Sequence, residues 1–416
     1  MGRGRVSGVA SEGGGEGRAD DRLALVAWSA IAEPGDAVAS AIVAVLGPAE
    51  ALRWAREAVT DPVGASIDLA ASASREVVDR AIASLERWTA RAAAWDPAPH
   101  LERAAKVGAR AIVRGDDEWP AEFDDLGAAA PYCLWARGPA NVRDAWARSV
   151  AIVGSRSSTA YGEHVAATLA AGLADEGWGV VSGGAYGIDA RAHRGALAAG
   201  GLTVAVMAGG VDRPYPQGNS DLLARVLETG AIVGESPPGY APYRSRFLTR
   251  NRIIAASRVT VVVEAAHRSG ALSTASHASA LGRPLAAVPG PVTSAGSLGC
   301  HRLIRDGATL VTGPQDVLEL VEPLDAARGL ADDEGGEGPG RAGAVGFSSV
   351  EQRRAYDAIG RRGSTIGEVA AAAGLTTNEA RTALGGLALL GSARKDGVLW
   401  RRAPAPHRGS DRARGG

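Results

Sequence analysis

The 416-residue sequence predicts an α/β fold with a doubly wound parallel sheet. Short apolar runs rich in β-branched residues recur through the middle of the chain, separated by Gly/Ser-rich turns and alanine-rich helical stretches. Continuous apolar strands that alternate with helices are typical of a parallel sheet covered on both faces. The predicted strands are SVAIV (149–153), GVVS (179–182), TVAVM (203–207), AIVGE (231–235), VTVVV (259–263) and PLAAV (284–288).

Further parts are predicted on either side of this α/β core from composition and pattern. The N-terminal part has short alanine-rich helices with four tryptophans, for which a packing or interaction role is favoured over DNA binding. The C-terminal part predicts three short helices and a hairpin, the order of a winged helix. The predicted parts are a disordered tail (1–20), a small SAM/HhH-like helical domain (21–105), the α/β domain (106–322), a flexible linker (323–347), a winged-helix domain (348–402) and a basic tail (403–416).

The overall composition excludes several classes of protein. The formal net charge of −1 gives no global basic field, so any site for a polyanion must be local. Lys106 and Lys395 are the only lysines, and neither stands in a G-x-x-x-x-G-K-[ST] motif, which excludes the usual Walker ATPases and kinases. Two cysteines give no disulfide framework, and no apolar run approaches the ~20 residues of a membrane span. We therefore expect a cytoplasmic protein without a membrane partner.

The segments that follow the predicted strands are small, hydroxylic or glycine-rich, and most of them lead into a helix. They are GSRSSTAYG (154–162), SGGAYGIDARAH (182–193), AGGVDRPYP (208–216), GESPPGYAPYRSRF (234–247), EAAHRSGALST (264–274) and PGPVTSAGSLG (289–299). Ligands of open parallel sheets bind outside the carboxyl ends of the strands. Small residues let backbone N–H groups approach an anion, and helix N-termini add partial positive charge. Six such segments at one edge predict a phosphate-lined pocket.

Arginines and aromatic residues gather in the same segments. No acidic residue lies between Glu235 and Glu264, but five arginines do: Arg244, Arg246, Arg250, Arg252 and Arg258, with Arg156 in the first turn. This favours phosphate binding, although pairing with an acid is the alternative for Arg252. Tyr161, Tyr186, Tyr215, Tyr240, Tyr243 and Phe247 also lie there. Aromatic platforms interleaved with arginines are typical of sites for unpaired bases.

No catalytic motif accompanies this pattern. The sequence contains neither a G-x-S-x-G elbow nor an H-E-x-x-H set, so we expect no catalytic residue, metal or cofactor. Asp189 and His193, four residues apart, are expected to form a local structural pair. Glu264 is the best carboxylate for hydrolysis, which keeps a nucleotide-binding or nucleotide-hydrolysing enzyme or sensor as the alternative. A third interpretation assigns DNA binding to the winged helix, whose candidate recognition helix (376–391) is mostly apolar.

Seven ordered blocks resemble the DprA/Smf DNA-processing family. They are GSR (154–156), SGGAYGIDARAH (182–193), GGVDRPYP (209–216), FLTRNRIIAAS (247–257), VVVEAAHRSGALSTASHASALGRP (261–284), VPGPV (288–292) and SLGCHRLIRDGA (297–308). The resemblance implies an extended Rossmann-like domain that binds single-stranded DNA in its pocket. It also implies a homodimer that protects incoming DNA and helps to load RecA recombinase during natural transformation.

The resemblance also assigns roles to individual residues, which we take as expectations. The predicted DNA and phosphate contacts are Gly154, Ser155, Arg156, Ser182, Gly183, Gly187, Arg246, Arg250, Asn251, Arg252, Ser269, Gly270 and Thr274. The candidates for base stacking are Tyr161, Tyr186, Tyr243 and Phe247. The sequence departs from the family pattern at Gly184, where leucine is common, and at Tyr186, where some members carry lysine. It departs again at His301, where asparagine is usual.

Overall fold

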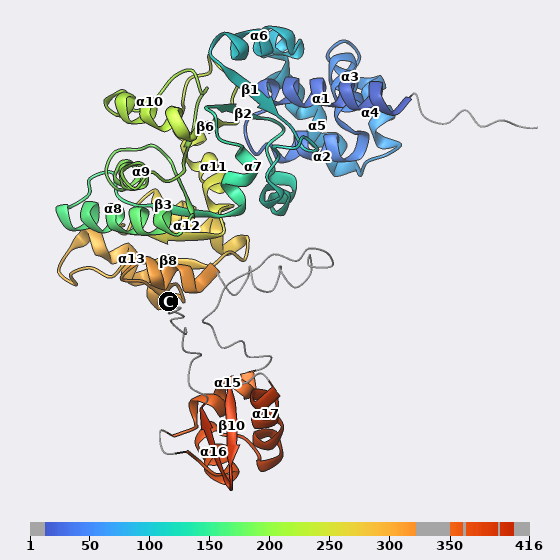
Figure 1. The fold of residues 1–416 in the computed structure, drawn as a ribbon. Helices are drawn as coiled ribbons and strands as arrows, with labels where there is room; N and C mark the ends of the chain where they lie inside the picture. The colour runs from blue at the N-terminus through green and yellow to red at the C-terminus, as the bar shows by residue number, and fades with distance from the viewer. Residues whose placement is uncertain (1–12, 322–349, 361–362, 390–391, 403–416) are drawn as a thin grey trace, which may run out of the picture. The chain divides into compact units, whose positions relative to one another are not determined.

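The computed structural model describes residues 13–321, 350–360, 363–389 and 392–402, which belong to two compact units (Figure 1). The first unit spans Met1–Ala331 and the second Asp332–Gly416. The predicted linker and the basic tail lie outside the described residues, as does the start of the predicted N-terminal tail. The two units are described separately below.

A nine-stranded mixed sheet forms the centre of the first unit, in the order β1-β2-β6-β5-β4-β3-β7-β8-β9. All neighbours from β6 to β9 are parallel, whereas β2 pairs antiparallel with β6 and β1 pairs antiparallel with β2. The strands are β1 (Ala109–Ile112), β2 (Leu134–Arg137), β3 (Ser149–Val153), β4 (Gly179–Ser182), β5 (Thr203–Met207), β6 (Ala231–Gly234), β7 (Val259–Val262), β8 (Leu285–Ala287) and β9 (Thr309–Leu310). Each of the six predicted strands is present, so the doubly wound sheet is confirmed.

Helices cover both faces of this sheet because its strands are apolar on both sides. In β3, Val150 and Ile152 pack against one layer of helices, while Ala151 and Val153 belong to the core on the opposite face. The first layer contains α8 (Ala160–Asp175) and α9 (Ile188–Ala198); the second contains α7 (Val142–Ala147), α11 (Arg244–Ala255), α12 (Ala271–Ala280) and α13 (Leu298–Arg305). The helix α10 (Ser220–Thr229) packs beside β5 and β6. Every residue of β3, β4 and β7 is buried.

The N-terminal part is helical and packs beside β1 and β2 (Figure 1). Its helices are α1 (Gly13–Ile31), α2 (Ala37–Leu46), α3 (Pro48–Thr60), α4 (Pro62–Ala70), α5 (Arg75–Thr89) and α6 (Ala98–Lys106). The expected disordered tail over 1–20 is wrong from Gly13 onward, because α1 begins there. Trp28 and Trp88 meet edge to face in its core, with ring centroids 5.5 Å apart. Trp135 of β2 donates a hydrogen bond to Ser29 of α1, which ties the helices to the sheet.

The second unit contains three helices followed by a β-hairpin. They are α15 (Val350–Asp357), α16 (Ile366–Ala373), α17 (Thr377–Leu389), β10 (Ala393–Asp396) and β11 (Leu399–Arg402). A capping box between Thr365 and Glu368 begins α16, and Leu384 and Leu387 of α17 are buried in the small core. This is the expected order of elements, and the winged-helix domain itself stays a prediction.

Among the described helices, none is long and apolar enough by itself to cross a membrane. The pair α2 and α3 meets the length and composition criterion only together, with a bend of 115° between them.

Candidate nucleic-acid interface

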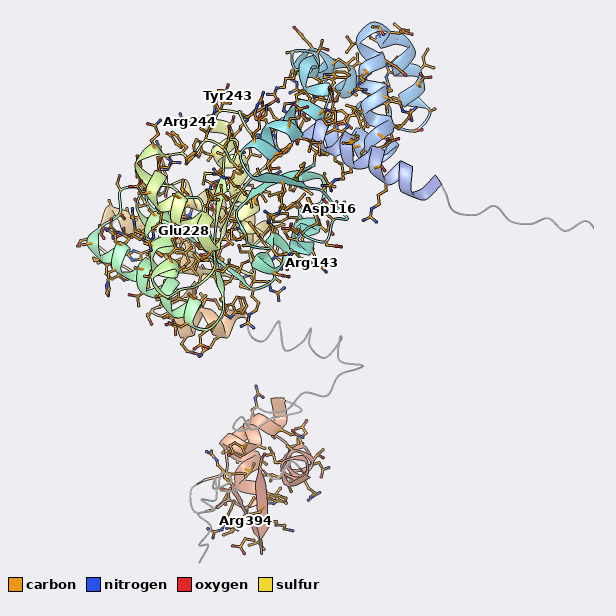
Figure 2. The ribbon with its side chains drawn as sticks, turned by 45° about the horizontal axis from the view of Figure 1, so that its top comes forward. Asp116, Arg143, Glu228, Tyr243, Arg244 and Arg394 are labelled. Carbon is orange, nitrogen blue, oxygen red and sulfur yellow. The ribbon has the colours of Figure 1, made fainter. Side chains whose placement is uncertain are left out.

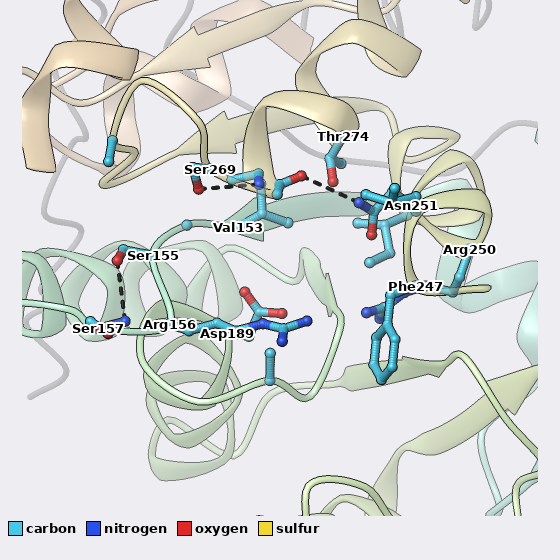
Figure 3. A pocket seen from close by; sticks show the side chains of 17 residues that line it. Val153, Ser155, Arg156, Ser157, Asp189, Phe247, Arg250, Asn251, Ser269 and Thr274 are labelled. Carbon is cyan, nitrogen blue, oxygen red and sulfur yellow. Dashed lines mark hydrogen bonds between the residues drawn. The ribbon is translucent and has the colours of Figure 1, made fainter. Parts of the chain in front are cut away.

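A pocket opens at the carboxyl ends of β3, β4 and β7, where a sheet of this kind places its ligands (Figure 3). Its volume is about 390 Å³. Segments from four separate parts of the sequence line it: Val153, Gly154, Ser155, Arg156, Ser157, Ala185, Asp189, Phe247, Leu248, Arg250, Asn251, Ile254, Ala266, Ser269, Gly270, Ala271 and Thr274. Nine of the seventeen predicted contact and stacking residues therefore come together here: Gly154, Ser155, Arg156, Phe247, Arg250, Asn251, Ser269, Gly270 and Thr274.

Arg250 supplies a buried positive charge at the base of this pocket. Its Nη1 donates to the carbonyl oxygen of Val206, and the residue is only 5% exposed. Burial lowers the pKa of Arg250 to about 10, with Asp189 opposing the shift and Arg156 adding to it, so the guanidinium stays charged at neutral pH. Burial also raises the pKa of Asp189, and the charge of Arg250 opposes that rise.

Gly183 makes room for this arrangement. Its N–H donates to Oδ2 of Asp189 at 3.1 Å. A Cβ at this position would collide with the Arg250 guanidinium and would lie 2.7 Å from the Asp189 carboxylate. The expected pair between Asp189 and His193 is absent from the described contacts. Instead, Nδ1 of His193 lies 2.7 Å from the hydroxyl of Thr203.

Arg156 adds a second, exposed guanidinium on the opposite side of the pocket. Its guanidinium carbon lies 5.3 Å from the ring centroid of Phe247, and Figure 3 shows its side chain reaching across the pocket. Within the described part of the chain, no carboxylate lies within ion-pair distance of Arg156 or Arg250. Asp189 is the single acidic residue among the lining residues, so two cations outweigh one anion and the pocket has a net positive charge.

The wall formed by α11 and α12 carries polar groups without charge. Nδ2 of Asn251 donates to the carbonyl oxygen of Gly270 at 3.3 Å, and the N–H of Ala271 donates to Oγ of Ser269 at the same distance (Figure 3). The first bond holds the β7–α12 turn against α11, and the second lies within the turn. The hydroxyl, amide and backbone groups of this wall can accept or donate hydrogen bonds to a phosphodiester or a base.

Two of the predicted phosphate-binding arginines form ion pairs with carboxylates and are not among the residues that line the pocket. Arg252 forms a two-bond ion pair with Glu235, at 2.5 and 2.6 Å, which confirms the structural alternative for this residue. Arg246 forms a two-bond ion pair with Glu33 of the N-terminal part, at 2.8 and 2.9 Å. Glu33 is 213 residues away in the sequence. The absence of acidic residues from the sequence around Arg246 therefore did not predict that a carboxylate lies beside it in the fold.

Four other predicted contacts, Ser182, Gly187, Tyr161 and Tyr243, are not among the residues that line the pocket. Oγ of Ser182 donates to the carbonyl of Ile152 at 2.7 Å inside the sheet. Gly187 has a φ of 75°, and a Cβ there would collide with the carbonyl of Ser155. The hydroxyl of Tyr161 donates to the carbonyl of Pro289 at 2.7 Å, and Tyr243 covers Arg246 instead of the pocket.

An aromatic side cavity adjoins the pocket and shares Arg156, Ala185 and Phe247 with it. Its volume is about 70 Å³, and it is also lined by Gly183, Tyr186, Tyr215 and Pro216. The rings of Tyr215 and Phe247 lie 5.6 Å apart with a tilt of 55°. Two predicted stacking residues, Tyr186 and Phe247, therefore lie beside the charged groups. Tyr215 was not among the predicted contacts, although its position after a strand was a usable signal.

Glu264, the candidate for hydrolytic chemistry, has a structural role. Its Oε2 accepts from the N–H of Thr159 at 2.9 Å, and its Oε1 accepts from the hydroxyl of Thr159 at 2.5 Å. Thr159 is the N-cap of α8, so Glu264 orders the start of that helix. The side chain is buried and is not among the residues that line the pocket.

The parallel part of the sheet and the cationic pocket at its carboxyl edge define a Rossmann-like protein. A sequence profile of the DNA recombination-mediator protein A family matches residues 110–322, and the chain belongs to this family. The resemblance to DprA/Smf proteins predicted from the sequence is thus confirmed, and with it a role in DNA processing and recombination.

Individual relatives extend the match beyond that region. The DNA processing protein DprA assigned in Mycobacterium tuberculosis is 46% identical over 379 residues, which cover 88% of this chain and 90% of that protein. DprA of Streptococcus pneumoniae is 40% identical over 208 residues, covering 50% of this chain and 72% of that protein. The solved structure of the pneumococcal protein aligns with a TM-score of 0.57 at 30% identity, over 73% of this chain and 98% of that one.

Proposed function

We propose that the protein binds single-stranded DNA in the pocket at the carboxyl edge of the sheet. The observation that carries this proposal is the convergence of Arg156 and Arg250 on one cavity with a net positive charge. Guanidinium groups suit phosphates because their N–H donors match phosphate oxygens in pairs. The adjoining cavity with Tyr186, Tyr215 and Phe247 offers ring faces to unpaired bases, each stacked base contributing about 1–3 kcal/mol.

The biological role that we propose is the protection of incoming single strands and their delivery to RecA recombinase, by a homodimer in the cytoplasm. Support for delivery comes from membership of the DNA recombination-mediator family. Cys133 and Cys300 are both free and buried, which accords with a reducing compartment. Light scattering tests the dimer, and stimulation of RecA-driven strand exchange tests delivery; loss of both would restrict the proposal to DNA binding.

Binding without hydrolysis is the form of this proposal that the site supports best. The alternative enzyme or sensor required Glu264 as catalytic acid or base, but Thr159 engages both of its carboxylate oxygens. The acid that does line the pocket, Asp189, lies beside Arg250 and accepts from a backbone N–H, an arrangement that orients cationic and polar groups.

The experiment that tests the proposal compares nucleic acids of one sequence in two forms. A labelled oligonucleotide of about 20 nucleotides, single-stranded or annealed to its complement, is titrated with the full chain and followed by anisotropy. We expect tighter binding of the single strand, because only unpaired bases can stack on the side cavity. Equal affinity for the duplex would contradict the proposal. Incubation with nucleoside monophosphates and cyclic dinucleotides, with Glu264→Gln as control, tests the enzymatic alternative; base release that this variant loses would favour it.

A further inference from the structure

A second cluster of arginines lies where the N-terminal helices meet the beginning of α11. Arg246 and Arg91 approach the same carboxylate, that of Glu33, from two sides. Both carboxylate oxygens of Glu33 accept hydrogen bonds from Arg246. Nη2 of Arg91 donates to Oε1 of Glu33, and Nη1 of Arg91 donates to the carbonyl oxygen of Ile31. Arg246 is nearly inaccessible, with 4% of its side chain exposed, but 29% of the Arg91 side chain is exposed to solvent.

Aromatic faces accompany these charges. The guanidinium of Arg246 lies 5.1 Å from the ring centroid of Tyr243 and 5.6 Å from that of Tyr240. Tyr243 is 59% exposed, so one face of its ring remains available. Figure 2 shows Tyr243 and the neighbouring Arg244 projecting from the surface. An exposed ring beside arginines is the arrangement on which single-stranded nucleic acids stack.

The cluster has more positive charge than its carboxylate can neutralise. Two arginines, Arg91 and Arg246, share the single carboxylate of Glu33, and Arg244 follows Tyr243 in the sequence. Burial lowers the pKa of Arg91, and the neighbouring charge of Arg246 lowers it further, as expected for cations crowded around one anion. A phosphate beside Arg91 would relieve this repulsion, because it would bring a second negative charge to the cluster.

Helix α11 connects this cluster directly to the pocket. Phe247 and Arg250 are three residues apart and lie on one face of the helix, and Tyr243, the N-cap residue of the helix, precedes Phe247 by four residues. The distance along the helix from Tyr243 to Arg250 is about 10 Å at 1.5 Å per residue. Phe247 stands between them and lines both the pocket and its side cavity. A strand held at Arg250 therefore meets Tyr243 within a few nucleotides of chain.

We propose that Arg91, Tyr243 and Arg244 form a second subsite for the DNA strand as it leaves the pocket. In this subsite Arg91, from the N-terminal part, contacts a phosphate, and Tyr243 stacks on one nucleobase. The ion pair between Glu33 and Arg246 supports both side chains and does not itself contact the DNA. This inference rests on the proposed function, since it extends the path of the same single strand. It gives the N-terminal helices a direct part in DNA binding.

Two lengths of oligothymidylate separate the subsite from the pocket. A strand of about 4 nucleotides fills the pocket, whereas one of about 20 nucleotides also reaches the subsite, in line with the roughly 4–16 nucleotides that one single-strand binding module covers. The variants are Arg91→Ala and Tyr243→Ala. The matched control is Arg75→Ala, which removes the same charge from a side chain that is 95% exposed at the far end of α5.

We expect Tyr243→Ala to weaken binding of the long strand by roughly five- to 100-fold. Arg91→Ala should make the slope of log K against log salt shallower by about 0.7, the contribution of one phosphate on a single strand. Both variants should bind the short strand within about twofold of the unaltered protein, and Arg75→Ala should resemble the unaltered protein at both lengths.

Two results would overturn the inference. One is a parallel loss of affinity for both lengths, which would mean that the residues only support the pocket; the other is unchanged affinity for the long strand. Should Arg91→Ala lose its fold by circular dichroism, the exposed Tyr243→Ala and Arg244→Ala variants decide the question. If the unaltered protein binds neither length, the proposed function itself fails.

Discussion

Arg252 and Glu235 form an ion pair in the interior of the α/β domain, with Nη2 2.5 Å from Oε1 and side chains 4% and 10% exposed. The guanidinium also donates to the backbone carbonyls of Ala129 and Thr249, so α11, β6 and the segment before β2 meet at this residue. We therefore predict that Arg252→Ala lowers the free energy of unfolding by about 3–5 kcal/mol, because it leaves a buried carboxylate without a partner.

Urea unfolding measures this change, and Arg302→Ala is the matched control. Arg302 and Asp306 form an exposed pair at 3.4 Å, so its loss should change the free energy by about 0.5 kcal/mol or less. A stable Arg252→Ala protein that had lost DNA affinity would contradict the structural role and return Arg252 to the DNA-binding residues.

Gly183 gives a second prediction, which concerns the shape of the pocket. The Cβ of Gly183→Ala would enter the space of the Arg250 guanidinium and the Asp189 carboxylate, so both groups must move. We expect the affinity for single-stranded DNA to fall at least tenfold, with a destabilisation of about 1–3 kcal/mol from overpacking. Gly313→Ala is the control, since a Cβ there meets nothing within 4 Å. Equal affinities of the two variants would show that the position of Arg250 does not matter.

His193 predicts how stability depends on pH. Burial, followed by the charges of Arg250 and Arg194, lowers the pKa of His193 to about 3. Because Thr203 gives its hydroxyl hydrogen to Val180, Nδ1 of His193 must donate to Thr203, and the ring is neutral in the folded state. The unfolded chain therefore takes up a proton first as the pH falls below about 6.5, and stability declines from there toward pH 3.

We expect His193 to lower the free energy of unfolding by about 1.4 kcal/mol for each pH unit below this point, in addition to the decrease that other groups cause. The measurement is the free energy of unfolding between pH 7.5 and pH 5, compared with His193→Gln, which cannot take up the proton. A smaller loss in the variant agrees with the prediction. Parallel curves for the two proteins would contradict it.

The sequence predicted the sheet well because each strand carries its signal locally. The strands at 149–153, 179–182 and 203–207 lie where the apolar runs predicted them. Every residue in these strands is buried, so each strand appears in the sequence as an uninterrupted apolar run. The strands β1, β2 and β9 were not predicted, because strands of four, four and two residues at or next to the sheet edges carry little hydrophobic pattern. The glycine-rich start of the chain suggested disorder, yet α1 begins at Gly13, and Arg22 near its middle pairs with Asp116 and docks the helix on the α/β domain.

The site was predicted in part, and the reason lies in long-range contacts. Glycines and hydroxyl residues after strands signal a pocket from sequence alone, and Gly154, Ser269 and Thr274 do line it. Whether an arginine is paired depends on which residues distant in the sequence the fold brings next to it. Glu33 comes from a different part of the protein to neutralise Arg246, while Arg156 has no such partner among the described residues. Periodicity contains no information about that difference.

The C-terminal unit provides a test of where DNA affinity lies. The exposed Arg394 and Lys395 of β10 could touch a phosphate backbone, whereas the buried residues of α17 pack within the unit. Because the pocket lies wholly within the first unit, we predict that a chain lacking 348–416 retains single-strand affinity within about threefold at moderate salt. Anisotropy titration checks this, and a complete loss of binding would assign the affinity to the C-terminal unit.

The salt dependence of single-strand binding tests the pocket most directly. Each phosphate neutralised on a single strand contributes about −0.7 to the slope of log K against log salt. We predict that the double variant Arg156→Ala, Arg250→Ala flattens that slope by about 1.4, while Arg302→Ala, which removes an exposed charge elsewhere, leaves it unchanged. A double variant that remains folded and keeps the slope of the unaltered protein would contradict the pocket as the DNA-binding site.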